Sequence, residues 1–402
     1  MILKGVQDVL IEKNCAWIIA NSIDWLLKYD IPQKKLELVA PYPEDMGTDH
    51  NPFSKIVKLE NEIYFIPQTA KDIFCYNLEK NEFNKLNAPI DPIRYSHNIQ
   101  TIVKDKVLYC VERFPDSIVK IDTVSKSIKV FEFDNNPYVK KNIESEIYRL
   151  YKSLCLHNGK IIWPNYKNIL TAFDIELEEF SVETLDGLSQ ERVERMDKNK
   201  NIKLEDWIIG VQSFQNSLWL FSFEGKIYQY NDKIRKIEKT FADNYNKDTD
   251  KLEVSVFRES VLLEDELWFI PQYKNKCVKY NSNAKQFEIV MDSYIGTWDG
   301  YERDYTVCKA VDKQKILAFS YYENCFYLLD IKQDLVHKKK LRIPIEEFIK
   351  EPAFYQSIVD NNQYRFDDLD FLWKEMQCRK RIQQENYKNS IVGKKIYESL
   401  KV

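Results

Sequence analysis

Three arginines, Arg94, Arg149 and Arg303, lie fourteen or fifteen residues ahead of a marked position in recurring apolar runs of the sequence. A shared spacing of this kind predicts that the three guanidinium groups lie on one rim of a repeated fold. Their planar forks suit a carboxylate or phosphate group, and nearby aromatic side chains could stack on a sugar ring or a peptide side chain. The predicted ligand-binding rim comprises Arg94, Tyr95, Arg149, Trp207, Arg258, Trp298 and Arg303. The alternative is that these arginines form salt bridges to acidic neighbours.

The chain has four histidines, and two of them, His50 and His97, could share that rim. Two histidines and a carboxylate can form an open metal site, so His50 and His97 are the metal-ligand candidates. With so few ligands, the sequence predicts no metal and no cofactor. No serine lies in a GxSxG motif, and no glycine-rich loop could hold a phosphate. Catalytic residues therefore stay unassigned, and a protein that is not an enzyme is favoured.

The positions used for this spacing belong to an internal repeat of about fifty residues. Six copies have a bulky residue in an apolar run, and the seventh has Ala318 there. Ten to twelve residues later, every copy has an apolar residue followed by Asp or Asn. A further apolar residue follows that Asp or Asn after six positions. The seven copies of the second mark are Tyr29-Asp30, Tyr76-Asn77, Ile121-Asp122, Phe173-Asp174, Tyr230-Asn231, Tyr280-Asn281 and Leu329-Asp330. Seven repetitions of one offset indicate a structural repeat.

Each copy of the repeat predicts four short antiparallel strands. Apolar runs such as 62–66 and 266–270 are short and bounded by turn formers, which is typical of buried strands. An Asp or Asn at the end of a strand can accept hydrogen bonds from backbone amides two residues on, and so begin a turn. Seven such units predict an all-β fold, a seven-bladed β-propeller. The expected blades cover residues 5–40, 53–87, 97–133, 150–184, 207–241, 254–290 and 305–342.

The repeat resembles that of the kelch-like propeller superfamily over roughly residues 9–341. In that family an aromatic residue and an Asp or Asn end the third strand, and a large aromatic residue follows about six positions later. Tyr76-Asn77 with Phe83, and Tyr280-Asn281 with Phe287, fit this pattern. The paired glycines of kelch repeats are missing, since the chain has only nine glycines. The resemblance implies a repeat protein that binds ligands or other proteins.

Two regions depart from the repeat. Residues 1–343 are expected to form the propeller and residues 344–402 a short helical tail, because Phe366, Leu369, Leu372, Trp373 and Met376 follow helical spacing. This tail is expected to dock on the propeller, the alternative being an amphipathic segment offered to a partner. The charged stretch from Asp186 to Asp206 is expected to be a solvated loop. No blade is split between the termini, so a strand from 1–4 or from the tail could close the ring.

Composition limits the possible partners. The chain of 402 residues is 44% hydrophobic and 30% charged with a net charge of −4, which predicts a globular protein that does not bind nucleic acid. No run of about 18 apolar residues exists, so no membrane span is expected. Eight cysteines lie scattered with no CxxC pair, most of them in apolar runs, which predicts buried reduced thiols and a cytoplasmic location.

Together these observations predict a cytoplasmic propeller that serves as a binding scaffold. Its partner would be a protein, a peptide or a small anionic ligand, held at the loop rim of the central channel. The alternative is an enzyme that acts on a glycan or another acidic small molecule at the same channel mouth.

Overall fold

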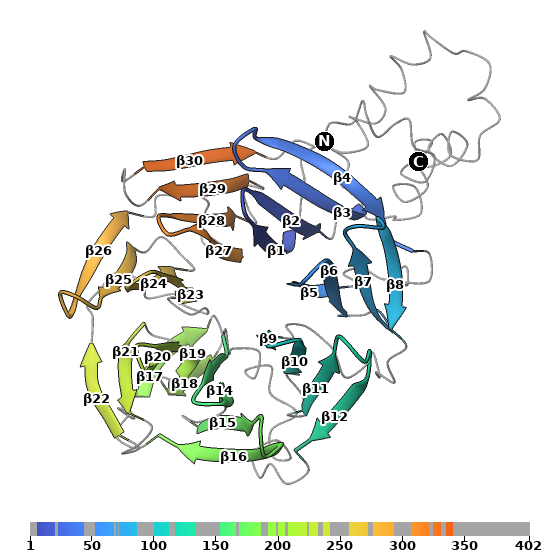
Figure 1. Cartoon of the computed structure of the whole chain (residues 1–402). Coiled ribbons are helices and arrows are strands. Elements are labelled where there is room, and N and C mark those ends of the chain that lie inside the picture. The colour runs from blue at the N-terminus through green and yellow to red at the C-terminus, as the bar shows by residue number, and fades with distance from the viewer. Residues whose placement is uncertain are drawn as a thin grey trace, which may run out of the picture.

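The computed structural model describes residues 6–20, 23–43, 53–67, 70, 72–86, 100–111, 117–133, 153–165, 169–185, 192–197, 200–205, 208–222, 225–231, 236–241, 257–271, 276–292, 307–320, 325–330 and 335–340. Seven four-stranded antiparallel sheets stand around a common axis (Figure 1). Each sheet consists of four consecutive strands, with the first strand innermost and the fourth outermost. The predicted all-β, seven-bladed propeller is confirmed.

The blades begin and end close to the positions expected from the repeat. Blade 1 contains β1 (Val6–Glu12), β2 (Cys15–Ala20), β3 (Ile23–Asp30) and β4 (Lys35–Pro41); blade 2 contains β5 (Phe53–Leu59), β6 (Glu62–Pro67), β7 (Ile73–Asn77) and β8 (Glu82–Leu86). Blade 3 contains β9 (Gln100–Lys104), β10 (Val107–Val111), β11 (Ser117–Asp122) and β12 (Ile128–Glu132); blade 4 contains β13 (Cys155–His157), β14 (Lys160–Asn165), β15 (Ile169–Asp174) and β16 (Glu179–Thr184). Within a blade, the four strands are called a, b, c and d from the inside outward.

The remaining three blades follow the same order. Blade 5 contains β19 (Ile208–Phe214), β20 (Ser217–Ser222), β21 (Ile227–Asn231) and β22 (Lys236–Phe241). Blade 6 contains β23 (Phe257–Leu263), β24 (Glu266–Pro271), β25 (Lys276–Asn281) and β26 (Gln286–Asp292). Blade 7 contains β27 (Val307–Asp312), β28 (Lys315–Ser320), β29 (Cys325–Asp330) and β30 (Leu335–Lys340).

The turn between strands c and d is built by the Asp or Asn of the repeat. Asn77, Asp122, Asp174 and Asn281 each accept two hydrogen bonds, from the backbone N–H groups two and three residues on, at 2.9–3.1 Å. Asp30 accepts one from Gln33 at 2.7 Å. These bonds satisfy amides that the strand ladder leaves free, which is why the repeat keeps a short polar acceptor here. The predicted role of this mark is confirmed in these five blades.

The core is divided among the faces between blades. Seven clusters of buried apolar side chains each join two neighbouring sheets, including the last sheet to the first. The bulky residues of the strand b mark are central to them; Tyr64, Trp163, Trp219 and Trp268 are at most 1% exposed. Each sheet covers the apolar faces of its neighbours, so the ring buries them only when complete.

One expectation about the connections is wrong. Within the charged stretch 186–206, β17 (Arg192–Asp197) and β18 (Lys200–Glu205) form a separate two-stranded hairpin rather than a loop. The register pairs Arg192 with Glu205 and Glu194 with Lys203, so residues of opposite charge occupy opposed positions, an arrangement that favours strand pairing. A high density of charged residues in this stretch was therefore not a sufficient reason to predict a loop.

The predicted helical tail, 344–402, and the N-terminal residues 1–4 lie outside the described residues. The helical spacing of the tail and its docking on the propeller stay predictions. In the part of the chain that the structure describes, no helix has the length and apolar character needed to cross a membrane.

Candidate functional site

The two faces of the ring differ in the length of their connections. In each blade the a–b and c–d turns lie on one face, because consecutive strands are antiparallel, and the b–c and d–a connections lie on the other. The a–b turns are two residues long, and the c–d turns have four residues, or five in blade 3. By contrast, thirteen residues separate β8 from β9, and twenty-two separate β12 from β13. We call these two sides the short-turn face and the long-connection face.

Six of the seven predicted rim residues belong to d–a connections and lie outside the described residues: Arg94, Tyr95, Arg149, Trp207, Trp298 and Arg303. Along the chain they fall between the last strand of one blade and the first strand of the next, and the proposed rim stays a prediction for them. The seventh, Arg258, is the second residue of β23, so it belongs to an innermost strand rather than to the connection before it. His50 and His97, the metal-ligand candidates, also lie outside the described residues.

Around the axis, the described part of the innermost strands carries a network of charged side chains. Asp8 of β1 is buried, with 2% of its side chain exposed. Its Oδ1 lies 3.4 Å from Nζ of Lys55 in blade 2 and 3.6 Å from Nζ of Lys309 in blade 7. Its Oδ2 accepts a hydrogen bond from the Ile56 N–H at 3.1 Å. One carboxylate thus contacts both neighbouring blades.

The position of Asp8 has equivalents in two other blades. Ser153 of blade 4 and Glu259 of blade 6 also lie four residues before the last residue of strand a. The Ser153 hydroxyl accepts from the Val211 N–H at 3.0 Å, and Glu259 Oε2 accepts from the Cys308 N–H at 2.8 Å. Each acceptor therefore binds the backbone of the next blade. The sequence did not predict this set: the same register holds Lys55 and Gln100 in two further blades, but Gly210 and Cys308 in the remaining two.

The electrostatics of Asp8 follow from these contacts. Burial by itself would raise the pKa of the Asp8 carboxyl, but the charges of Lys309 and Lys55 and the bond from Ile56 hold that pKa below its usual value. The same pairing with Asp8, aided by the charge of Glu259, raises the pKa of Lys309. Both groups are therefore charged at neutral pH, and the pair acts as an ion-pair joint rather than as an acid–base couple.

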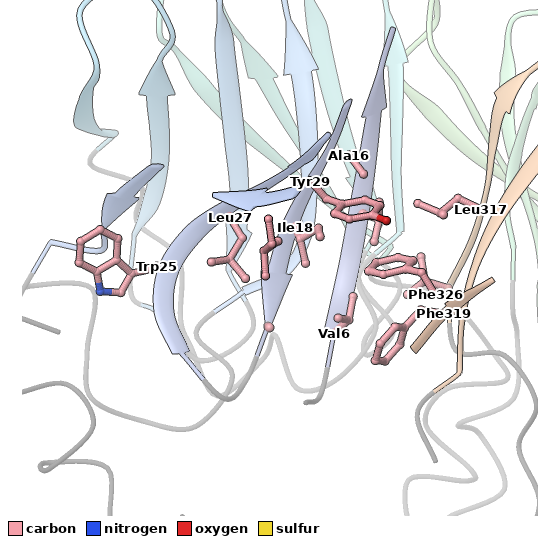
Figure 2. Close-up of a cluster of buried hydrophobic side chains, with 13 residues drawn as sticks. Val6, Ala16, Ile18, Trp25, Leu27, Tyr29, Leu317, Phe319 and Phe326 are labelled. Carbon is pink, nitrogen blue, oxygen red and sulfur yellow. The ribbon is translucent and has the colours of Figure 1, made fainter. Parts of the chain in front are cut away.

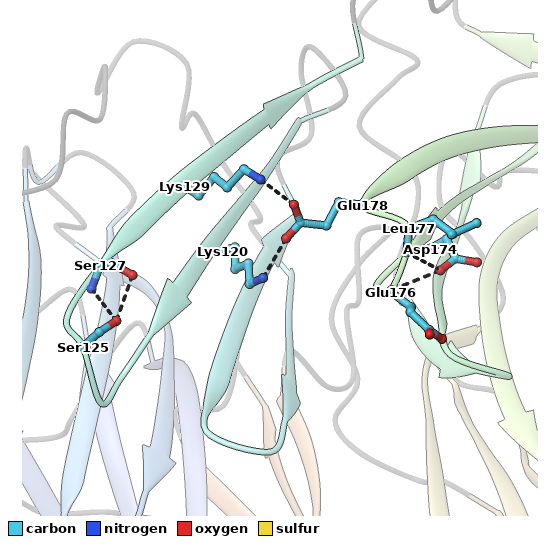
Figure 3. Close-up of polar contacts among 8 residues, drawn as sticks. All are labelled: Lys120, Ser125, Ser127, Lys129, Asp174, Glu176, Leu177 and Glu178. Atoms are coloured by element: carbon cyan, nitrogen blue, oxygen red, sulfur yellow. Dashed lines mark hydrogen bonds and ion pairs between the residues drawn. The ribbon is translucent and has the colours of Figure 1, made fainter.

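A second set of joints lies further out, toward the short-turn face. Glu178, in the c–d turn of blade 4, accepts from Lys120 at 2.7 Å and also from Lys129, both of blade 3 (Figure 3). Lys126, in the c–d turn of blade 3, donates to Glu62 and to the Tyr64 hydroxyl of blade 2. The pKa of Glu178 is lowered by its bonds to the two lysines. These side chains tie neighbouring blades together.

Among the described residues, no three His, Cys, Asp or Glu side chains are placed so that they could hold a metal ion. The polar side chains that we describe here form hydrogen bonds and ion pairs between neighbouring blades. These contacts join the blades into a ring that has a short-turn face and a long-connection face.

Comparisons with known proteins agree with this architecture. No protein-family model and no curated protein matches the chain. Among solved structures, U3-55K matches with a TM-score of 0.53 and 8% identity, covering 80% of this chain and 90% of that one. A chain from the crystal structure of the Mitotic Checkpoint Complex matches with a TM-score of 0.52 and 10% identity, covering 85% and 87%.

The β-propeller domain of Cps50 (Swd1) from Myceliophteria thermophila matches with a TM-score of 0.50 and 8% identity, covering 82% of this chain and 96% of that domain. At 8–10% identity these similarities show the propeller fold alone. They do not confirm the kelch-like subfamily.

Proposed function

We propose that the protein is a non-enzymatic binding scaffold whose long-connection face holds a protein or peptide partner, or a small anionic ligand. The observation that carries this proposal is the asymmetry of the ring. Seven blades joined by buried clusters form a rigid support, and the long connections all leave it on one side. Binding residues are commonly presented by variable loops on such a scaffold.

Protein partners are the class that we favour. One of the similar solved structures is a chain within the Mitotic Checkpoint Complex, and so the same fold serves there in an assembly. In this chain the connections contribute aromatic residues and arginines, the types that dominate the binding energy of protein interfaces. A cytoplasmic location and kelch-like kinship are parts of the same proposal, supported by the scattered cysteines and by the aromatic-Asn pairs.

The test compares two matched triple variants of the full chain. The first, R94Q/R149Q/R303Q, removes three positive charges from the long connections. The second, K34Q/K80Q/K285Q, removes three from exposed positions in c–d turns of the short-turn face. Circular dichroism and thermal unfolding confirm that both fold, and proteins captured from an extract of the source organism are quantified by mass spectrometry.

We expect the arginine variant to lose the captured proteins by on the order of tenfold, and the lysine variant to retain them. Equal capture by both variants and the unaltered chain would show that the long-connection face is not the binding site. Titration calorimetry with inorganic phosphate and with a hexaglutamate peptide extends the test to a small anionic ligand. We again expect weaker binding by the arginine variant than by the lysine variant.

A further inference from the structure

The ring closes between its last and first blades without sharing a sheet. Blade 1 consists of β1 to β4 and blade 7 of β27 to β30, so each of the two sheets has its four strands from one end of the described chain. At the other six joints, a connecting segment of the chain links one blade to the next, and the segment between blades 4 and 5 contains the β17–β18 hairpin. We call the face between blade 7 and blade 1 the seam. Within the described residues, it is the joint at which no chain connection links the two sheets.

Apolar packing across the seam is continuous. Val6, Ile18 and Leu27 of blade 1 belong to one buried cluster with Leu317 and Phe319 of blade 7 (Figure 2). The ring of Tyr29 stacks on Phe326, with centroids 5.9 Å apart and planes 6° from parallel. Such packing stabilises the closed ring but has no directional restraint from a strand ladder.

A buried charge reinforces this packing. Asp8 is 2% exposed and faces Lys309 across the seam and Lys55 across the joint to blade 2, while Lys309 is 34% exposed. The backbone N–H groups of Val9 and Ile56 also support the Asp8 carboxylate. The charge of Glu259 in blade 6 also favours the charged form of Lys309. Removing a partner from such a pair leaves a charge in a poorly solvated place, which is strongly unfavourable.

From this arrangement we propose that the ring opens preferentially at the seam, and that the Asp8–Lys309 pair is the latch that keeps it closed. Opening there separates two complete sheets and unfolds neither of them. At any other joint the connecting segment still tethers the two blades after their faces part. Local openings of this kind are governed by the contacts they break rather than by global stability.

Hydrogen–deuterium exchange of the full chain, resolved by peptide, tests the proposal through two matched variants. K309Q removes the partner of Asp8 across the seam, and K55Q removes its partner across the joint that the chain connects. We expect K309Q to accelerate exchange in β1, β2 and β27 to β29 by about tenfold or more. Exchange in β14, β15 and β20, on the opposite side of the ring, should stay within about twofold of the unaltered chain.

For K55Q we expect a clearly smaller acceleration at the seam strands. Equal acceleration by both variants, a uniform acceleration through all seven blades, or no change at the seam would each overturn the proposal. The unaltered chain gives a measurement that needs no substitution: β1 and β29 should exchange faster than β19 and β21, their counterparts in blade 5. The reverse order in the unaltered chain would also overturn it.

Discussion

Glu178 of blade 4 and Lys285 of blade 6 occupy the same place in their c–d turns, four residues after the Asp or Asn, and both have left-handed backbone with φ of 54° and 55°. Lys34, Asn81 and Lys126 occupy that place in three further blades, with φ of 54–57°. This conformation costs a residue with a Cβ about 1–2 kcal/mol. Glycine is the residue that most often adopts this conformation. At two of the five positions the side chain has a role that glycine could not fill, because Glu178 and Lys126 each bond to a side chain of the preceding blade.

Replacing Lys285 by glycine should therefore stabilise the protein, since Lys285 is exposed and glycine adopts this backbone without steric conflict. We expect a gain of about 0.5–1 kcal/mol in the free energy of unfolding, after the greater flexibility of glycine in the unfolded chain is counted. Urea unfolding measures it. E178G is the matched control: it loses the bonds to Lys120 and Lys129, so its stability should fall below that of K285G. Equal gains in both variants would contradict this account.

Gly210 is required by its neighbour on the adjacent strand. A Cβ at this position would lie 1.8 Å from the Cζ atom of Phe221, which is a fully buried ring. We expect G210A to lower the free energy of unfolding by about 1–3 kcal/mol through overpacking. The double variant G210A/F221L should recover part of that loss when compared with F221L alone. If the two changes were simply additive in thermal unfolding, the contact would not be the cause.

The turn acceptor of blade 6 should make a measurable contribution to stability. Asn281 accepts from the N–H groups of Asn283 and Ala284 at 2.9 and 3.1 Å. N281A removes both bonds and should reduce the free energy of unfolding by about 1 kcal/mol. N281D keeps an acceptor oxygen at the same place and should stay near the unaltered value. Chemical denaturation of the three proteins side by side gives the comparison.

The Asp8 carboxyl should contribute to acid sensitivity. Because its pKa in the folded protein is below the ordinary value of 3.8, its contribution is present above that pH and is lost as the pH falls through the folded pKa. We expect the stability of the unaltered chain to decline from about pH 4 downward more steeply than that of D8N. Urea unfolding at a series of acidic pH values tests this; parallel curves would show that Asp8 is not responsible.

Buried thiols should resist modification in the native protein. Burial raises the pKa of Cys155 to about 12 and that of Cys75 to about 11, so neither forms the reactive thiolate near neutral pH. Six of the described cysteines form no disulfide and five of these six are buried, which confirms the predicted burial for those five. Iodoacetamide labelling followed by mass spectrometry should modify Cys15, which is partly exposed, before Cys75 and Cys155. As a control, the denatured protein should be labelled fully at all three cysteines.

The sequence by itself determined the blade count and the blade boundaries. Its marks are local: the acceptor at Asp122 or Asn281 builds a turn with its own next residues, and the bulky residue of strand b fills the face beside it. Local hydrogen bonds and apolar periodicity repeat with the chain, so they can be recognised without coordinates.

Only the tertiary structure decided how the blades are joined. Asp8 meets Lys309 across nearly the full length of the described chain, and Glu178 meets Lys120 across more than fifty residues. The hairpin at 192–205 and the place of Arg258 inside β23 were likewise not predicted. Such contacts depend on which residues face one another once the ring has closed, because an ion pair is set by distance in space and leaves no fixed spacing along the chain.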